Sequence, residues 1–183
     1  MERNVVMIAL FAALIAVLGL IPKITLGFVP VPITAQTLGV MLCGTVLGAR
    51  RGALAVLLFL LLVALGLPLL SGGRGGLGAF ASPSAGFLIG WPLGAYVTGW
   101  IVERWRGVPL TLAAIVASVI GGIGVIYVFG VIGMAIVLDK SLLEATALVT
   151  AFIPGDVLKA AVAGMLTGAL AKARPASVLS RAA

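Results

Sequence analysis

The chain has 183 residues, of which 62% are hydrophobic and 9% are charged, and its mean hydropathy is +1.31. These values exclude a water-soluble domain of this size, so the surrounding solvent is expected to be lipid. At about 20 apolar residues per crossing, the length predicts roughly six membrane helices in one all-α domain, residues 1–183. The formal charge of +7 does not indicate nucleic-acid binding, because the basic residues lie between apolar runs.

In chain order, the apolar runs predict transmembrane helices at residues 4–22, 33–48, 53–70, 84–102, 110–138 and 154–172. The first run stops at Pro22 and Lys23, and the turn formers Gly27, Pro30 and Pro32 then predict a loop. The fifth run is long enough to tilt or to bend at Gly121, Gly122 and Gly124.

Two further segments lie outside these helices. Residues 71–84 read SGGRGGLGAFASPS, which is too rich in Gly and Pro for a regular helix and predicts a loop at the membrane surface. Residues 141–152 are mixed in character, and Pro154 suits the first turn of the last helix.

The distribution of Lys and Arg predicts the orientation of the chain. With the N-terminus inside, the outer side holds Lys23, Arg74 and Lys140, and the inner side holds Arg3, Arg50, Arg51, Arg104, Arg106, Lys172, Arg174 and Arg181. Because cytoplasmic loops carry the excess of basic residues, both termini are predicted to be cytoplasmic. The irregular segments then converge on the outer face.

The residue types argue against catalysis and against a bound metal or cofactor. The chain has no His, and its one cysteine, Cys43, lies in an apolar run, so a transition metal lacks ligands. No spacing ties Ser82 or Ser84 to Lys159 as a nucleophile and base, and no oxyanion donor is identifiable. We therefore expect no enzyme, no metal and no cofactor.

The most informative pair is Asp156 and Lys159 in FIPGDVLK. At positions i and i+3 they share one helix face, and each would cost roughly 2.5–3.5 kcal/mol in lipid unless paired or turned inward. Asp156 also lies in the first helical turn, where the helix dipole favours a carboxylate. The pair is either a structural ion pair or a ligand site that accepts N–H groups and offers a cation.

Two other polar features lie near the predicted outer face. Gln36, in PVPITAQTLGV, either bonds to a neighbouring helix or meets a ligand, and its outward position favours a ligand. The loop GGRGGLGAF has backbone N–H groups that can approach a ligand closely, but it lacks the context of a nucleotide-binding loop. Arg74, its one charge, is either a surface residue or a partner for an anionic ligand.

The first helix carries small residues four apart, Ala9 with Ala13 and Ala12 with Ala16. Such pairs let another helix approach closely, and packing within the protein itself is the simpler interpretation.

Four segments, PVPITAQTLGVMLCG, LGARRGALAVLLFLLLVALGLPLLSGG, GGLGAFASPSAGFLIGW and FIPGDVLKA, resemble the BioY family of biotin transporters over nearly the whole chain. The resemblance implies a six-helix S-component of an energy-coupling factor (ECF) transporter, in the bacterial cytoplasmic membrane, that captures biotin at the outer face. The implied partners are a transmembrane T-component and two ABC-type ATPases, and docking topples the S-component within the membrane. The alternative is a chain that acts alone, as a homo-oligomer.

The resemblance also implies roles for particular residues. It makes Ala9 and Ala13 a docking face for the T-component, which replaces the simpler interpretation above. The implied biotin-site residues are Gln36, Gly73, Arg74, Gly75, Gly76, Ser84, Phe87, Trp91, Asp156 and Lys159. Asp156 would accept from the ureido N–H groups, Lys159 would stabilise Asp156 or meet a biotin oxygen, and Phe87 and Trp91 would pack on the rings.

The chain departs from the family pattern after the Gly-rich loop. Ser82–Phe87 reads SPSAGF, where relatives commonly have Gly-Pro-Thr/Ser-Gly-Gly-Tyr, and Leu88 stands where some relatives have Arg. Arg74 thereby becomes a candidate for holding the ligand carboxylate. Two other functions remain open: an S-component for another vitamin, or a membrane assembly subunit whose Asp156–Lys159 pair is purely structural.

Overall fold

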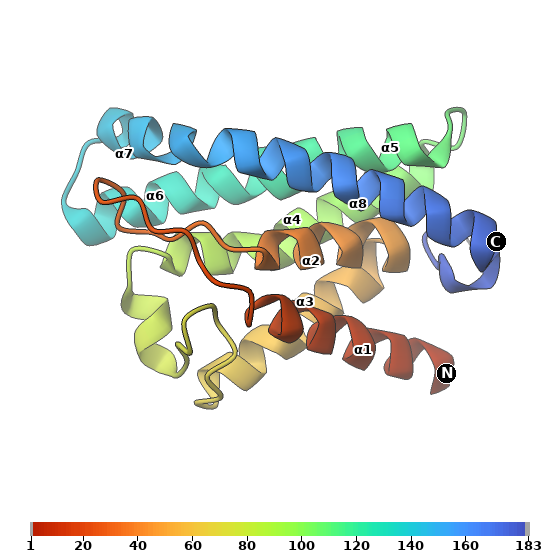
Figure 1. Ribbon diagram of the computed structural model, residues 1–183, viewed down its shortest axis with the longest axis horizontal. Helices are drawn as coiled ribbons and strands as arrows, with labels where there is room; N and C mark the ends of the chain where they lie inside the picture. The colour runs from red at the N-terminus through yellow and green to blue at the C-terminus, as the bar shows by residue number, and fades with distance from the viewer. Residues whose placement is uncertain (1, 182–183) are drawn as a thin grey trace.

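The structure is a computed structural model that describes residues 2–181 as a bundle of helices (Figure 1). The α-helices are α1 (Glu2–Leu18), α2 (Gln36–Leu42), α3 (Ala49–Ala64), α4 (Ala85–Arg104), α5 (Leu110–Ala117), α6 (Ile126–Leu138), α7 (Leu142–Val149) and α8 (Ile153–Ala173). Within the described residues, extended pairing is limited to two isolated bridges, Ile24 with Ile33 and Leu70 with Arg74. The predicted all-α class is confirmed.

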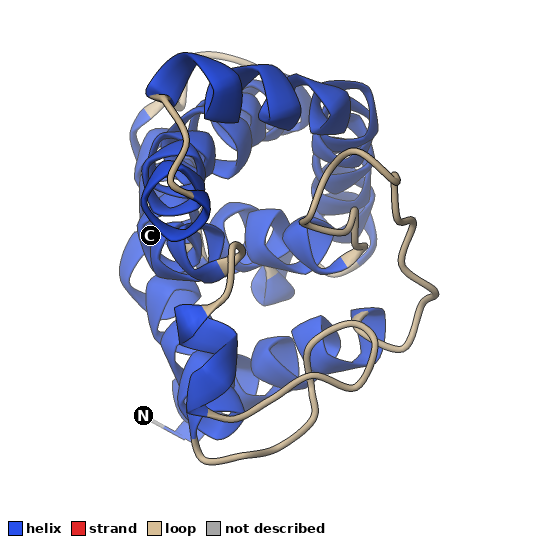
Figure 2. Cartoon of the chain, turned by 90° about the vertical axis from the view of Figure 1, so that its left-hand side faces the viewer, coloured by secondary structure: helices blue, strands red, loops and turns tan. Residues whose placement is uncertain are grey.

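The long helices run roughly along one direction, and the two ends of the bundle differ (Figure 1). Both described termini lie at one end of the bundle. The long loops after α1 and α3, and the turn between α6 and α7, lie at the other end. Figure 2 looks onto that second end and shows the loops crossing it. The predicted convergence of irregular segments on one face is therefore present.

Three continuous helical segments among the described residues are long and apolar enough to cross a membrane: Ala85–Arg104, Leu110–Leu138 and Leu142–Ala173. The second of these joins α5 to α6 through a π-helical stretch, Ser118–Val125, which contains all three glycines of the predicted bend. The helices near the N-terminus are shorter, with 17 residues in α1 and 16 in α3. Between them, α2 continues through a π-helical turn, Cys43–Leu47.

The third helix differs from its prediction at both ends, beginning at Ala49 and ending at Ala64 rather than spanning 53–70. At its start, the Ala49 N–H donates to Glu103 Oε1 at 2.9 Å, which supplies a cap that sequence spacing could not indicate. At its end, Gly66 adopts φ +105° and Pro68 disfavours helical backbone at the residue before it. The apolar residues 65–70 are therefore loop.

The segment 141–152, interpreted from the sequence only as mixed, is mostly helical. Ser141 and Glu144 form a reciprocal capping box that starts α7. A 3-10 turn, Thr150–Phe152, then leads directly into α8, so Leu142–Ala173 is one helical segment of 32 residues. Pro154 lies in the first turn of α8, as predicted.

Close helix packing centres on α4, which contacts α3, α6 and the π-helical stretch before α6. A Cβ on Gly86 would lie 2.2 Å from the Phe129 carbonyl oxygen, and one on Gly94 would lie 2.7 Å from that of Gly121. Only glycine permits this approach, which is the usual way for membrane helices to pack without a hydrophobic driving force. The same contact places the aromatic face of α4 beside α6 and builds one wall of the site.

Candidate ligand-binding site

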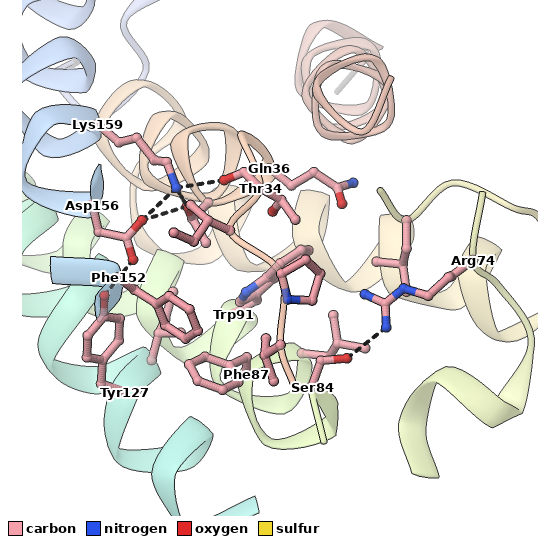
Figure 3. Close-up of a pocket in the computed structure, with 17 residues that line it drawn as sticks. Thr34, Gln36, Arg74, Ser84, Phe87, Trp91, Tyr127, Phe152, Asp156 and Lys159 are labelled. Atoms are coloured by element: carbon pink, nitrogen blue, oxygen red, sulfur yellow. Dashed lines mark hydrogen bonds and ion pairs between the residues drawn. The ribbon is translucent and has the colours of Figure 1, made fainter. Parts of the chain in front are cut away.

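A pocket lies at the loop-bearing end of the bundle, enclosed by α2, α4, α6, α8 and the two long loops (Figure 3). It encloses about 570 Å³, including the space that opens to solvent. Its lining comprises Val31, Pro32, Ile33, Thr34, Gln36, Thr37, Leu70, Arg74, Ser84, Phe87, Leu88, Trp91, Ile126, Tyr127, Phe152, Asp156 and Lys159. The lining is predominantly apolar, with polar groups concentrated at two places, which is typical of a small-molecule site.

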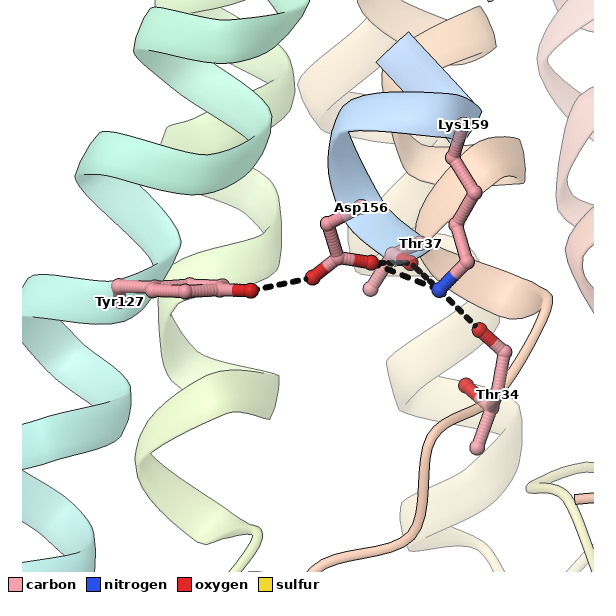
Figure 4. A network of polar contacts seen from close by, with 5 residues as sticks. All are labelled: Thr34, Thr37, Tyr127, Asp156 and Lys159. Carbon is pink, nitrogen blue, oxygen red and sulfur yellow. Dashed lines mark hydrogen bonds and ion pairs between the residues drawn. The ribbon is translucent and has the colours of Figure 1, made fainter. Parts of the chain in front are cut away.

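The first polar group is the predicted Asp156–Lys159 pair (Figure 4). Lys159 Nζ lies 2.7 Å from Asp156 Oδ1, and Asp156 is only 4% exposed. Lys159 also donates to the Thr34 carbonyl at 2.6 Å and to Thr37 Oγ1 at 3.0 Å. All three ammonium donors therefore have partners, as a partly buried cation requires.

The carboxylate of Asp156 is held from three helices. Its Oδ1 accepts from Lys159 in α8 and from Thr37 Oγ1 in α2 at 3.2 Å, and its Oδ2 accepts from Tyr127 Oη in α6 at 2.7 Å. A carboxylate has about four acceptor positions, so Oδ2 keeps room for one further donor on the pocket side. The network orients Asp156 and leaves it able to accept from a ligand N–H.

Aromatic rings form the middle of the pocket. Phe87 meets Tyr127 and Phe152 edge to face, with ring centroids 6.2 and 6.0 Å apart. Trp91 packs against Phe59 at 6.1 Å, and its buried Nε1 has no hydrogen-bond partner among the described residues. The wall thus offers flat apolar surface together with one free donor, as expected where a ligand acceptor would lie.

The second polar group lies across the pocket from Asp156 and contains Arg74 (Figure 3). Arg74 Nη1 donates to Ser84 Oγ at 3.2 Å, and Ser84 Oγ lies 2.9 Å from Ser82 Oγ. Arg74 Nε is buried without a partner among the described residues, and burial lowers the pKa of the guanidinium. The cation is thus partly desolvated and has a donor to spare, as an anion-binding group needs.

Gln36 lies in the wall of the pocket, but its side chain bonds to the protein. Its Nε2 donates to the Ile15 and Leu69 carbonyls, each at 3.1 Å, and its Oε1 accepts from the Ser71 N–H at 2.9 Å. These bonds connect the start of α2 to the end of α1 and to the loop after α3. Both amide N–H groups already donate to backbone carbonyls. Gln36 therefore supports the fold of the site and has no N–H group free for a ligand.

The glycines of the predicted site are not among the residues that line the pocket. Gly73 and Gly76 adopt φ values of +71° and +76°, and a Cβ on Gly75 would lie 2.2 Å from the Leu67 carbonyl oxygen. These glycines allow the tight turn that brings Arg74 to the pocket. The structure thus gives these glycines a role in shaping the loop, and their direct contact with a ligand stays a prediction.

The predicted docking alanines face outward from α1. Ala9 and Ala13 are exposed, whereas Ala12 and Ile15 on the opposite face are buried in the core. Ala9 and Ala13 belong to a surface that includes the exposed Val6 and lies apart from the pocket.

Comparison with known proteins decides the family. The model of the BioY family matches residues 2–176, nearly the whole chain. The chain belongs to the BioY family. It is 54% identical to the biotin transporter BioY of Rhodobacter capsulatus, over 99% of this chain and 100% of the relative, and 58% identical to that of Rhizobium etli, over 90% of each. The crystal structure of the S-component for biotin from an ECF-type ABC transporter superposes with a TM-score of 0.89, at 31% identity, over 93% of this chain and 92% of that one.

This BioY-family pocket also contains residues that were not predicted from the sequence as site residues. Tyr127 and Phe152 both line it, and Thr34 and Thr37 hold Lys159. Tyr127 is one of two tyrosines in the chain, and its hydroxyl interrupts an otherwise apolar run. That interruption is the feature of the sequence that could have indicated a site residue. Phe152 is the first residue of the FIPGD motif, but nothing in the sequence indicates that its ring meets Phe87.

Proposed function

We propose that this protein binds biotin at the loop-bearing end of the bundle and serves as the substrate-capturing S-component of an ECF-type transporter. Its relatives at 54% and 58% identity are biotin transporters, and the superposed crystal structure is an S-component for biotin. The observation that carries the proposal is the buried Asp156 carboxylate, which is oriented from three helices and keeps an acceptor position beside an aromatic wall. Its role is binding and transport rather than catalysis.

The pocket suits the chemistry of biotin in three parts. The ureido N–H groups of biotin are donors, and Asp156 Oδ2 is a matching charged acceptor. The fused rings are compact and apolar, and Phe87 and Trp91 present flat apolar surface. The ureido carbonyl and the ring sulfur are acceptors, and Trp91 Nε1 is a free donor nearby.

The valerate carboxylate of biotin would extend toward Arg74. Arg74 lies across the pocket from Asp156, and its guanidinium is partly buried with Nε unpaired among the described residues. Ser84 holds the guanidinium in place through Nη1. Because Leu88 replaces the Arg of some relatives, Arg74 supplies the cation that this end of the pocket would otherwise lack.

We place six crossings in a bacterial cytoplasmic membrane, with both termini in the cytoplasm. The described termini lie at one end of the bundle. This agrees with the prediction that the side with the termini carries eight basic residues and the opposite side three. Helices α1 and α3, with 17 and 16 residues, extend about 25 Å, close to a hydrocarbon core of about 30 Å. The segment Gln36–Leu47 is shorter, but residues 39–47 are buried inside the bundle, so lipid need not cover them.

The proposed partners are a transmembrane T-component and two ABC-type ATPases. Support comes from the superposed crystal structure, which is an S-component of an ECF-type ABC transporter, and from the outward-facing pair Ala9 and Ala13, which permits close approach of another helix. A homo-oligomer would use the same kind of surface and is the alternative.

Uptake of labelled biotin tests this proposal in cells without another biotin transporter. Cells that express the chain with its transporter partners should accumulate biotin, and excess unlabelled biotin should suppress the label while other vitamins do not. Suppression by another vitamin alone would identify a different substrate. Uptake that is unchanged in an Asp156→Asn variant would support the assembly-subunit alternative.

A further inference from the structure

The start of α3 and the end of α4 lie toward the end of the bundle that holds the termini (Figure 1). A second hollow is lined by residues of these two segments, and it shares no lining residue with the biotin pocket. We call it the basic pocket, and its charged and aromatic lining residues are Arg50, Arg51, Tyr96, Trp100, Glu103 and Arg104. It lies between the start of α3 and the end of α4. The proposed binding of biotin uses none of these residues.

The basic pocket has an excess of positive charge. Three of its lining residues are arginines, and Glu103 is its one carboxylate. Glu103 Oε1 already accepts from the Ala49 N–H, and none of the three guanidinium groups forms an ion pair within residues 2–181. Arg51 meets only the neutral Asn4 side chain, at 3.4 Å. The pocket is therefore suited to an external anion.

An apolar stripe on α4 leads from the basic pocket along the bundle. Its members, spaced four, three, four and four residues apart and therefore on one helix face, are Ile89, Leu93, Tyr96, Trp100 and Arg104. The four apolar and aromatic side chains are 41–55% exposed. Arg104 lies 4.4 Å over the Trp100 ring, so the cation is held at the edge of the stripe.

A matching stripe on α3 starts at the same pocket. It consists of Arg50, Leu54, Leu57 and Leu61, spaced four, three and four residues apart, and its three leucines are 50–55% exposed. Helices α3 and α4 pack directly against each other, as the contact of Phe59 with Trp91 shows. Two exposed apolar stripes thus diverge from one basic pocket.

A basic pocket that continues into two apolar stripes is complementary to an amphiphile with an anionic headgroup. We propose that the basic pocket binds the phosphate of an anionic phospholipid, with the acyl chains lying along the α3 and α4 stripes. Basic pockets between helices on the cytoplasmic side are suited to lipid headgroups, and Trp and Tyr are the side chains that favour the membrane interface. A soluble phosphate would contact only the arginines, whereas a phospholipid would contact both the arginines and the apolar stripes that start beside them. The orientation given above places the lipid in the inner leaflet.

Retention of lipid by the purified full chain tests this inference. Native mass spectrometry from detergent, with equal phosphatidylglycerol and phosphatidylcholine, should show preferential retention of phosphatidylglycerol. The pocket variant carries Arg50→Gln, Arg51→Gln and Arg104→Gln. Its ratio of retained phosphatidylglycerol to retained phosphatidylcholine should fall by more than about tenfold, because each charge contributes about fivefold. The matched control removes three exposed arginines outside the pocket, through Arg3→Gln, Arg106→Gln and Arg174→Gln, and should retain the preference.

Several results would overturn the inference. An equal loss of the lipid preference in both triple variants would mean a general charge effect. An unchanged preference in the pocket variant would mean that the arginines do not bind lipid and instead face a protein partner. Full competition by inorganic phosphate would mean an anion site without a lipid. If the triple variant fails to fold, the single variants Arg50→Gln and Arg104→Gln should each lose about fivefold. The readout does not use biotin, so it stands apart from any failure of the proposed transport function.

Discussion

The Tyr127 hydroxyl on α6 donates a 2.7 Å hydrogen bond to Oδ2 of Asp156 on α8. The bond connects two helices that both line the pocket, and it acts on the oxygen that we assign to the ligand. It therefore orients the acceptor before biotin arrives, which reduces the ordering cost of binding.

Removal of this hydroxyl should weaken biotin binding without disturbing the aromatic wall. In Tyr127→Phe the ring that meets Phe87 remains, but Asp156 loses one charge-assisted hydrogen bond. We expect a loss of about 1.5–3 kcal/mol, or roughly 10- to 150-fold in Kd, measured by isothermal titration. The control is Tyr96→Phe, an exposed tyrosine outside the biotin pocket, which should bind as the parent does. Equal affinity in the two variants would contradict the assigned role.

Asp156→Asn should affect binding more directly. The substitution removes the charged acceptor and leaves the partly buried Lys159 ammonium without a counter-ion. We expect the binding free energy of biotin to weaken by about 1–3 kcal/mol or more, and the melting temperature in detergent to fall. Asp139→Asn is the matched control, because Asp139 is exposed at the turn after α6. A variant that melts earlier but binds biotin normally would make the pair purely structural.

Arg74 should be tested with two ligands rather than one. Arg74→Gln should weaken binding of biotin by about 1.5–3 kcal/mol, because it removes a charged partner of the carboxylate. Binding of biotin methyl ester, which has no carboxylate charge, should change little. A parallel loss for both ligands would show that Arg74 acts only by ordering the loop that carries it.

Gln36 should behave as a structural residue. Gln36→Ala leaves the Leu69 carbonyl and the Ser71 N–H without their partner, while the Ile15 carbonyl keeps its bond from the Gly19 N–H. An unmatched buried group costs about 1–3 kcal/mol, so the melting temperature in detergent should fall clearly. Thr146→Ala, which loses an exposed bond to the Leu142 carbonyl, is a control with little expected effect. An unchanged melting temperature with lost biotin affinity would instead place Gln36 at the ligand.

The exposed alanines of α1 should matter for transport but not for binding. Ala9→Trp or Ala13→Trp adds bulk where the proposed partner helix approaches, so labelled-biotin uptake should fall while biotin affinity of the isolated chain is kept. Ala169→Trp, at an exposed position on α8, is the matched control. Full uptake in the α1 variants would move the docking face elsewhere.

Much of this architecture could be predicted from the sequence, because the membrane imposes a simple rule on apolar runs. The first, second, fourth and fifth predicted ranges agree with the observed helical segments to within a few residues, whereas the last segment begins earlier than predicted, because α7 and a 3-10 turn lead directly into α8. The polar Asp156–Lys159 pair was predictable because lipid excludes unpaired charge. The end of α3 was not predictable from hydropathy. Residues 65–70 are as apolar as the helix before them, and the backbone at Gly66 decides the break.

Part of the site depends on contacts between distant segments, which a single sequence does not specify. Gln36 could meet either a ligand or the protein until the positions of Ile15 and Leu69 were known. The glycines around Arg74 indicated a flexible loop, but the loop brings the arginine to the pocket rather than the glycines themselves. Tyr127 lies 29 residues before Asp156, and only the folded arrangement brings the start of α6 close to the start of α8.

Calorimetric titration of the purified protein with biotin tests most directly whether the chain itself binds this vitamin. We expect saturable binding of one biotin per chain with a Kd below about 1 μM, equivalent to about −8 kcal/mol. Absence of binding by folded protein, or saturation by another vitamin in place of biotin, would contradict the proposed function.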